Sequence, residues 1–179
     1  MKKNILTFGL ISGAIISILM VISTTYFHKN PDYSGAMIWG YTSMLISFSF
    51  IVMGIINYRN KYNSGVISFG KAFQVGLMIA LIASTFYVAT WLVEYYCFIP
   101  DFMDKYAEHM IQQAVKKGES AEKIAKTTAE INTYKELYKS PLMVILLTYA
   151  EVLPLGFIVS LISALILKRK PKNPDLAKV

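Results

Sequence analysis

The chain has little charge, one cysteine and two histidines. The low charge argues against a soluble domain, and the single cysteine excludes two kinds of site. Charged residues make up 16% of the 179 residues and hydrophobic residues 55%, whereas about 25% of a soluble domain is charged. Cys97 is the only cysteine, which excludes an internal disulfide and a thiolate metal cluster. The sequence also lacks zinc-protease, phosphate-loop and serine-hydrolase motifs. We therefore expect neither enzymatic activity nor a cofactor.

The charges that are present leave four long apolar runs between them. These runs cover residues 4 to 27, 33 to 58, 72 to 93 and 141 to 167, and only the last contains a charged residue, Glu151. A helix needs about 20 apolar residues to cross about 30 Å of hydrocarbon. The predicted fold class is an all-α integral membrane protein: a single membrane domain, residues 1–179, with four transmembrane helices at about 5–27, 34–58, 72–93 and 141–167.

The first run also has one property of a secretory signal peptide, because it follows Lys2 and Lys3. The apolar core of a signal peptide is about 7 to 15 residues long and ends in an A-x-A-like cleavage site. Here the run is longer, and its end, VISTTYF, lacks such a site. We therefore expect an uncleaved first helix.

The segment between the third and fourth runs has a different composition. Residues 94 to 139 contain seven lysines and eight acidic residues. Apolar side chains recur there at helical spacing, at Met103, Tyr106, Met110 and Ala114 and again at Ile124, Ile131 and Tyr138. Pro100 suits a helix start, Gly118 a helix end and Ser120 a helix cap. The pattern predicts a helical hairpin at about residues 101–138.

The basic residues predict the orientation. Ten Lys and Arg lie in the two termini and the loop from Arg59 to Lys71, where Asp175 is the only acid. Lys and Arg accumulate in short cytoplasmic flanks, so we expect both termini in the cytoplasm and the hairpin on the extracytoplasmic side. Because the net charge of +7 is explained by this topology, we expect no binding of nucleic acid. The expected environment is the lipid bilayer of a bacterial inner membrane.

Small side chains recur every fourth residue in all four runs. Helices in lipid approach closely where such residues let their backbones touch. The ridges are Gly9, Gly13 and Ser17; Ala36 and Gly40, then Ser43 and Ser47; Ala72, Gly76, Ala80 and Ser84; and Gly156, Ser160 and Ala164. The pattern predicts a closely packed four-helix bundle.

Glu151 is the candidate for an intramembrane polar site. It lies roughly 15 Å along the last helix from Pro141, and a carboxylate there costs about 2.5 to 3.5 kcal/mol. We expect it to face the bundle, with Pro154 kinking the helix beside it. Hydroxyls at similar depth could bond to it, namely Ser17, Ser43, Ser47, Ser84, Thr85 and Tyr87. It is either a proton or cation site or a protonated carboxyl that holds the helices together.

A metal site at the start of the hairpin is the weaker alternative. Asp101, Asp104, Glu108 and His109 lie close together, and Asp104 and Glu108 share a helix face. His109 points elsewhere, and lysines alternate with the acids. We therefore interpret this segment as a solvated helix face and expect no metal.

The order of several short motifs resembles a bacterial membrane family catalogued as domain of unknown function 4199. The motifs are Ser68, Phe69, Gly70, Lys71, Ala72 and Phe73 followed by Gly76; Pro100, Asp101 and Phe102; and Gly118, Ser120 and Ile124. The resemblance covers most of the chain and implies a four-span inner-membrane protein. It implies no activity and no functional residues, because none are established for the family.

Two functions are compatible with these sequence features. One is a non-enzymatic scaffold or accessory subunit whose outer hairpin binds a protein partner or covers the mouth of the bundle. The other is a small transporter or channel that uses Glu151. An enzyme acting on lipid would need several polar groups at one depth, and we expect only Glu151 there. The oligomeric state stays open.

Overall fold

The computed structural model describes residues 1–29 and 35–169, and the described part is helical with one isolated β-bridge. The helices in chain order are α1 (Lys2–Lys29), α2 (Ala36–Tyr62), α3 (Phe69–Val93), the π-helix η1 (Glu94–Phe98), α4 (Phe102–Lys116), α5 (Ala121–Tyr138) and α6 (Pro141–Leu167). By length and composition, α1, α2, α6 and the continuous α3–η1 helix are apolar enough to cross a membrane. The all-α membrane fold is confirmed.

The third apolar helix ends later than the predicted span. It does not stop before Glu94, because η1 continues it to Phe98. The hydrogen bond from the Ile99 N–H to the Glu94 carbonyl spans five residues and defines this wider turn. The link that contains Pro31 lies outside the described residues.

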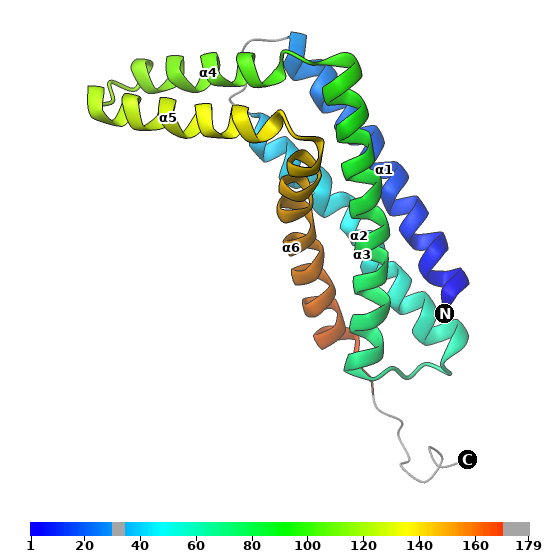
Figure 1. Ribbon diagram of the computed structural model, residues 1–179. Helices are drawn as coiled ribbons and strands as arrows, with labels where there is room; N and C mark the ends of the chain where they lie inside the picture. Colours follow the sequence, from blue (N-terminus) through cyan, green and yellow to red (C-terminus); the bar gives the residue numbers. More distant parts are fainter. Residues whose placement is uncertain (30–34, 170–179) are drawn as a thin grey trace.

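Helix α3 lies at the centre of the bundle and packs against α1, α2 and α6 (Figure 1). Fully buried side chains of this core include Phe48, Ile51, Ile55, Val75, Ile79 and Val152. At the end of the bundle that holds the N-terminus, Ile67 and Arg169 exchange two backbone hydrogen bonds and tie the α2–α3 link to the end of α6. This end is therefore held by both backbone and side chains.

Close approaches at small residues hold α3 against its neighbours. A Cβ added to Gly156 would lie 2.9 Å from the Ala80 Cβ, and one added to Gly76 would lie 3.1 Å from the Ser160 Cβ. These contacts join α6 to α3. The same helix places Ile82 over Gly9 and Phe86 over Gly13 of α1. The predicted ridges of α1, α3 and α6 are therefore confirmed as contact surfaces.

The prediction that the first part of the α2 ridge, Ala36 and Gly40, packs against another helix is wrong. A Cβ on Gly40 would meet none of the described atoms within 4 Å, because Ala36 and Gly40 line a cavity instead of packing on a helix. The close approach on α2 comes farther along the helix than the second part of the ridge, at Gly54, which lies against Ile79 and Phe8. Helix α2 crosses the bundle obliquely (Figure 1), so only part of its length touches α3.

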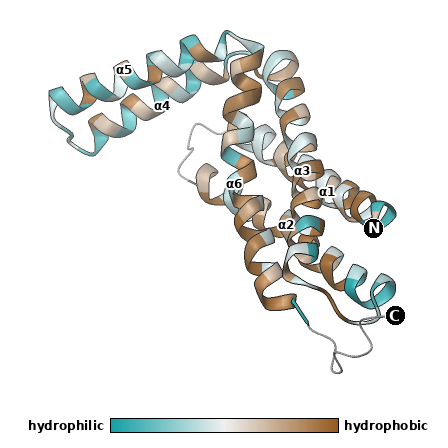
Figure 2. Ribbon diagram, turned by 60° about the horizontal axis from the view of Figure 1, so that its bottom comes forward, coloured by the Kyte–Doolittle hydropathy of each residue, from teal (hydrophilic) through white to brown (hydrophobic). Residues whose placement is uncertain are grey.

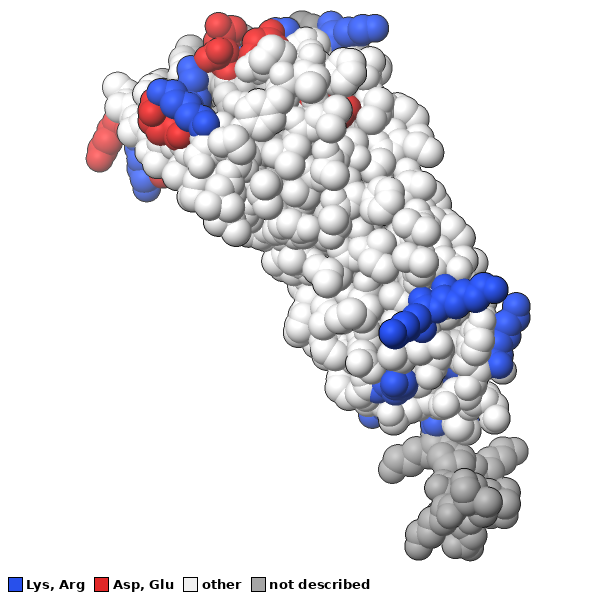
Figure 3. Space-filling model, turned by 45° about the vertical axis from the view of Figure 1, so that its right-hand side comes forward, with Lys and Arg blue, Asp and Glu red and all other residues white. Residues whose placement is uncertain are grey.

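Charge is segregated along the bundle. The sides of the bundle expose apolar residues, including Ile18, Ile38, Leu142, Ile162 and Ile166 (Figure 2). Figure 3 shows only Lys and Arg at the end where Lys2, Lys3, Arg59 and Lys168 lie, a wide uncharged surface, and charges of both signs at the other end. An apolar belt between two charged ends fits association with a lipid bilayer.

Helices α4 and α5 lie side by side and project away from the bundle (Figure 1). Gly118 adopts a φ of +68° after α4, a conformation that favours glycine. The Ser120 hydroxyl accepts a hydrogen bond from the Lys123 N–H and caps α5. Pro100 lies before the N-cap of α4, Asp101, and not inside the helix. Local sequence signals therefore define both helices.

We predict that Gly156→Ala destabilises the bundle and that Gly40→Ala does not. Both changes improve helix propensity equally, but only the first adds a Cβ against a neighbouring helix, where overpacking costs about 1 to 3 kcal/mol. Thermal unfolding in detergent should show a lower midpoint for Gly156→Ala and an equal or higher one for Gly40→Ala. Equal stabilities of the two variants would contradict the close α3–α6 contact.

Candidate functional site

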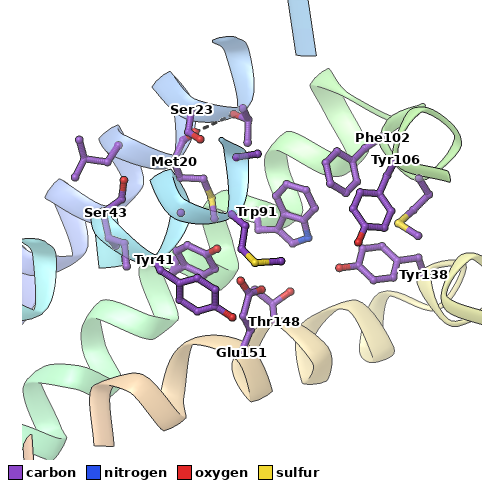
Figure 4. Close-up of a pocket in the computed structure, with 18 of the residues that line it drawn as sticks. Met20, Ser23, Tyr41, Ser43, Trp91, Phe102, Tyr106, Tyr138, Thr148 and Glu151 are labelled. Carbon is purple, nitrogen blue, oxygen red and sulfur yellow. Dashed lines mark hydrogen bonds between the residues drawn. The ribbon is translucent and has the colours of Figure 1, made fainter. Parts of the chain in front are cut away.

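A cavity of about 420 Å³ lies between the bundle and the base of α4 and α5 (Figure 4). Helices α1, α2, α3 and α6 contribute its wall, and α4 and α5 cover it. Seven of its lining residues are aromatic, namely Tyr41, Tyr87, Trp91, Phe102, Tyr106, Tyr134 and Tyr138. Ser43, Thr148 and Glu151 provide polar groups. The parts of α4 and α5 nearest the bundle therefore cover this cavity.

Glu151 reaches this cavity because of its position around α6. Val144, Thr148 and Val152 are buried along the face of α6 that packs into the bundle. Glu151 lies beside that face and is exposed, in the wall of the cavity. The structure gives its carboxylate no hydrogen bond to any of the described residues. Glu151 is therefore accessible in a cavity rather than packed among the helices.

Three of the eight predicted site residues line the cavity together, namely Glu151, Ser43 and Tyr87. Pro154 is exposed, and α6 continues through it from Pro141 to Leu167. The proline therefore does not end the helix or line the cavity.

The other predicted hydroxyls bond elsewhere. Ser17 accepts a hydrogen bond from Thr90 at 2.7 Å, which joins α1 to α3. Ser47 bonds to Ser12 on α1. Thr85 donates a hydrogen bond to the Leu81 carbonyl and accepts one from Tyr149. The Ser84 hydroxyl is buried without a partner in the described part of the chain. Similar depth on different helices did not bring these groups to Glu151.

Aromatic contacts hold α4 and α5 over the cavity. The rings of Trp91 and Phe102 meet edge to face at 4.9 Å between centroids, and those of Tyr95 and Tyr138 at 5.3 Å. Such pairs contribute about 0.5 to 1.5 kcal/mol each beyond their burial. Burial, with a smaller contribution from the nearby Glu151 carboxylate, raises the pKa of Tyr138 to about 12. Tyr138 therefore stays protonated and available as a hydrogen-bond donor.

Glu94 is a second carboxyl group that the sequence pattern did not identify as a site. It is 7% exposed, at the first turn of η1. Its Oε1 accepts a hydrogen bond from the Thr24 hydroxyl at 2.6 Å, but its Oε2 is buried without a partner among the described residues. The prediction that Glu151 is the only acid within the apolar helices is therefore wrong. The π-helix turns Glu94 toward α1, and no residue type in the sequence marks that wider turn.

Two of the three acids of the alternative metal site form ion pairs with lysines. Asp101 pairs with Lys105 at 2.8 Å, and Asp104 pairs with Lys135 of α5. The hydrogen bond from Lys105 holds the pKa of Asp101 below its usual value. Within residues 1–29 and 35–169, no group of three or more His, Cys, Asp or Glu side chains is arranged to hold a metal ion. The pair between Asp104 and Lys135 links α4 to α5 and stabilises the hairpin.

We predict that removing a polar group at Glu151 and at Glu94 changes the free energy of unfolding differently. Glu151→Leu removes a group without a hydrogen bond, so the free energy of unfolding should stay constant or rise. Thr24→Val leaves Glu94 Oε1 without its donor, at a cost of about 1 to 3 kcal/mol. Thermal unfolding in detergent measures both. A loss of about 1 kcal/mol in Glu151→Leu, the order of an interhelical hydrogen bond in lipid, would instead support Glu151 as a group that holds the helices together.

Comparison with known proteins identifies a family but no function. Residues 7–169 match the family described as "Protein of unknown function (DUF4199)". No curated protein and no solved structure matches the chain. The match reaches all six α-helices described above, including the pair α4 and α5. The chain therefore belongs to the DUF4199 family of proteins of unknown function.

Proposed function

We propose that this protein is a non-enzymatic scaffold or accessory subunit of a bacterial inner membrane, and that α4 and α5 bind a protein partner. The observation that carries this proposal is the projection of α4 and α5 from the bundle (Figure 1). The ends of α4 and α5 nearest the bundle cover the cavity. The rest of the two helices extends beyond the cavity and does not line it. A helical pair that extends past the structure it covers has surface available for another molecule.

The surface of this pair favours a protein partner over anionic lipid. Seven lysines and eight acids nearly cancel across residues 94 to 139, so the segment lacks the basic excess that attracts acidic headgroups. Val115 is 58% exposed, and Tyr134, which also lines the aromatic cavity, is 51% exposed. Exposed apolar and aromatic side chains among balanced charges are typical of protein interfaces.

The distribution of basic residues supports the proposed orientation. Lys and Arg without acids gather at the end of the bundle opposite α4 and α5 (Figure 3). Because cytoplasmic flanks are enriched in Lys and Arg, this distribution supports a cytoplasmic location for both termini. The α4–α5 pair then lies on the extracytoplasmic side.

A small transporter or channel is the second candidate, favoured by the cavity itself. Glu151 presents an accessible carboxylate, without a hydrogen-bond partner among the described residues, in a cavity lined by aromatic side chains. Acidic residues within transmembrane segments often mark ion or substrate pathways. In this function Glu151→Gln abolishes flux through reconstituted vesicles and leaves the fold intact.

We predict that position 120 is labelled from outside the cell and position 60 is not. Cys97 is exposed and would react as well, so the variants Ser120→Cys and Asn60→Cys are made in a Cys97→Ser background. Intact cells, or spheroplasts if an outer membrane is present, are treated with a membrane-impermeant maleimide, and permeabilised cells serve as the reference. Labelling of position 60 but not of position 120 in intact cells would reverse the orientation.

We predict that a photo-crosslinking amino acid at Val115 captures one discrete protein in native membranes. The same amino acid at Leu165 of α6 is the control, because Leu165 has a similar exposure of 49% but lies on the apolar side of the bundle. The adduct at position 115 should be absent at position 165 and should be identified by mass spectrometry.

Two results would contradict the scaffold. One is identical adducts at positions 115 and 165, which would indicate non-specific neighbours. The other is flux by the purified protein alone, lost in Glu151→Gln, which would favour the transporter.

A further inference from the structure

A second cavity, of about 660 Å³, lies between the ends of α1 and α3 where η1 begins. It is separate from the aromatic cavity, and the two share only Thr24 among their described lining residues. Glu94 and His28 line it together with apolar side chains that include Val21, Val93 and Phe98. It lies at the α4 end of the bundle, where the uncharged surface gives way to charged residues.

Two of the residues that line this cavity each have a buried polar atom without a partner among the described residues. The atoms are Oε2 of Glu94 and Nδ1 of His28. Carboxyl oxygens accept hydrogen bonds, and an unpaired buried acceptor costs about 1 to 3 kcal/mol. Such a cost is removed by a ligand that donates a hydrogen bond to Glu94.

The contacts of His28 define its unpaired nitrogen as a donor. Lys105 Nζ lies 3.2 Å from His28 Nε2 and also pairs with Asp101. An ammonium group only donates, so Nε2 accepts from Lys105 and the ring proton lies on Nδ1. The cavity therefore contains an unpaired acceptor on one residue and an unpaired donor on another.

One basic residue and several apolar side chains also line the cavity. Lys29 lines it beside His28, at the last residue of α1. Val21 and Val93 are 45% and 53% exposed and Phe98 is 73% exposed. These side chains continue onto the apolar outer surface of the bundle, where acyl chains lie in a bilayer.

We infer that this cavity binds the headgroup of an aminophospholipid, with a primary ammonium at Glu94 and the phosphate at His28 and Lys29. The ammonium supplies the hydrogen bond that Glu94 Oε2 lacks and the positive charge that a buried carboxylate requires. The phosphate accepts from His28 Nδ1 and pairs with Lys29. The acyl chains run from the headgroup toward the middle of the bundle, past Val93 and along Val21.

The arrangement distinguishes between lipid classes. Phosphatidylcholine carries the same charges as phosphatidylethanolamine, but its quaternary ammonium has no N–H to donate to Glu94. Phosphatidylglycerol has the phosphate but no cation. The cavity should therefore prefer phosphatidylethanolamine over both lipids.

The test uses native mass spectrometry of the purified full-length protein in detergent. Phosphatidylethanolamine, phosphatidylcholine and phosphatidylglycerol with identical acyl chains are added separately, and the bound fraction is measured against lipid concentration. Wild type should bind phosphatidylethanolamine at least about ten-fold more tightly than phosphatidylcholine, since a hydrogen bond to a charged group contributes enough for that ratio.

Three variants separate the contributions. In Glu94→Gln the amide oxygen still accepts from Thr24, but the charge is lost, so the preference for phosphatidylethanolamine should fall to about that of phosphatidylcholine. His28→Phe removes the phosphate donor, so both lipids should weaken together and their ratio should persist. Glu151→Gln is the matched control, because that carboxyl lines the other cavity, and it should keep the wild-type preference. Circular dichroism and thermal unfolding establish that each variant is folded.

Equal binding of the two zwitterionic lipids by wild type would overturn the inference, as would an unchanged preference in Glu94→Gln. A preference lost equally in Glu151→Gln would place the site in the aromatic cavity and overturn it too. Competition with soluble glycerophosphoethanolamine distinguishes a lipid from a free headgroup. Displacement of the lipid at equal concentration would show that the acyl contacts contribute nothing, and would overturn the assignment to a lipid.

Discussion

Close contact between helix backbones is the constraint on which this bundle depends. Apolar side chains gain little by leaving lipid for the interior of a bundle, so association depends on packing and on hydrogen bonds between helices. Gly156 against Ala80 and Gly76 against Ser160 bring α6 onto α3. Gly9 and Gly13 admit Ile82 and Phe86 on the other side of α3, and Ser12 and Ser47 join α1 to α2. A larger residue at these positions would separate the helices.

The two cavities follow from where this close packing ends. Toward α4 and α5 the small residues give way to Tyr87, Trp91 and Tyr138, large side chains that pack in or against a second cluster. Glu94 and Glu151, each with a carboxyl oxygen that has no hydrogen bond to the described residues, line cavities in this half. The bundle therefore combines a tightly packed half, which provides stability, with an aromatic half that has room for ligands. The transporter function and the lipid site both use the second half.

Part of the candidate site was predictable from sequence. Glu151 stands out because a charge in a long apolar run is costly, and Ser43 and Tyr87 do share a cavity with it. The hydroxyls of Ser17, Ser47 and Thr85 could not be assigned in this way. Depth along a helix follows from residue number, but direction around the helix relative to its neighbours depends on how the helices cross. Glu94 was missed for a related reason: at the edge of a charged segment, a buried acid and a solvated one have the same sequence context.

The sequence by itself determined the number and approximate extent of the apolar helices, the helices α4 and α5 with their glycine end and serine cap, and the small-residue surfaces of α1, α3 and α6. These features depend on composition and on contacts within a few residues, which chain order specifies directly. Only the tertiary structure decided that Gly40 borders a cavity, that Glu151 is accessible, and that Glu94 Oε2 and His28 Nδ1 lack partners among the described residues in a shared space. Those outcomes depend on the oblique crossing of α2, the wider turn of η1 and the position of α4 over the bundle. Each of these arises from packing between segments far apart in the chain.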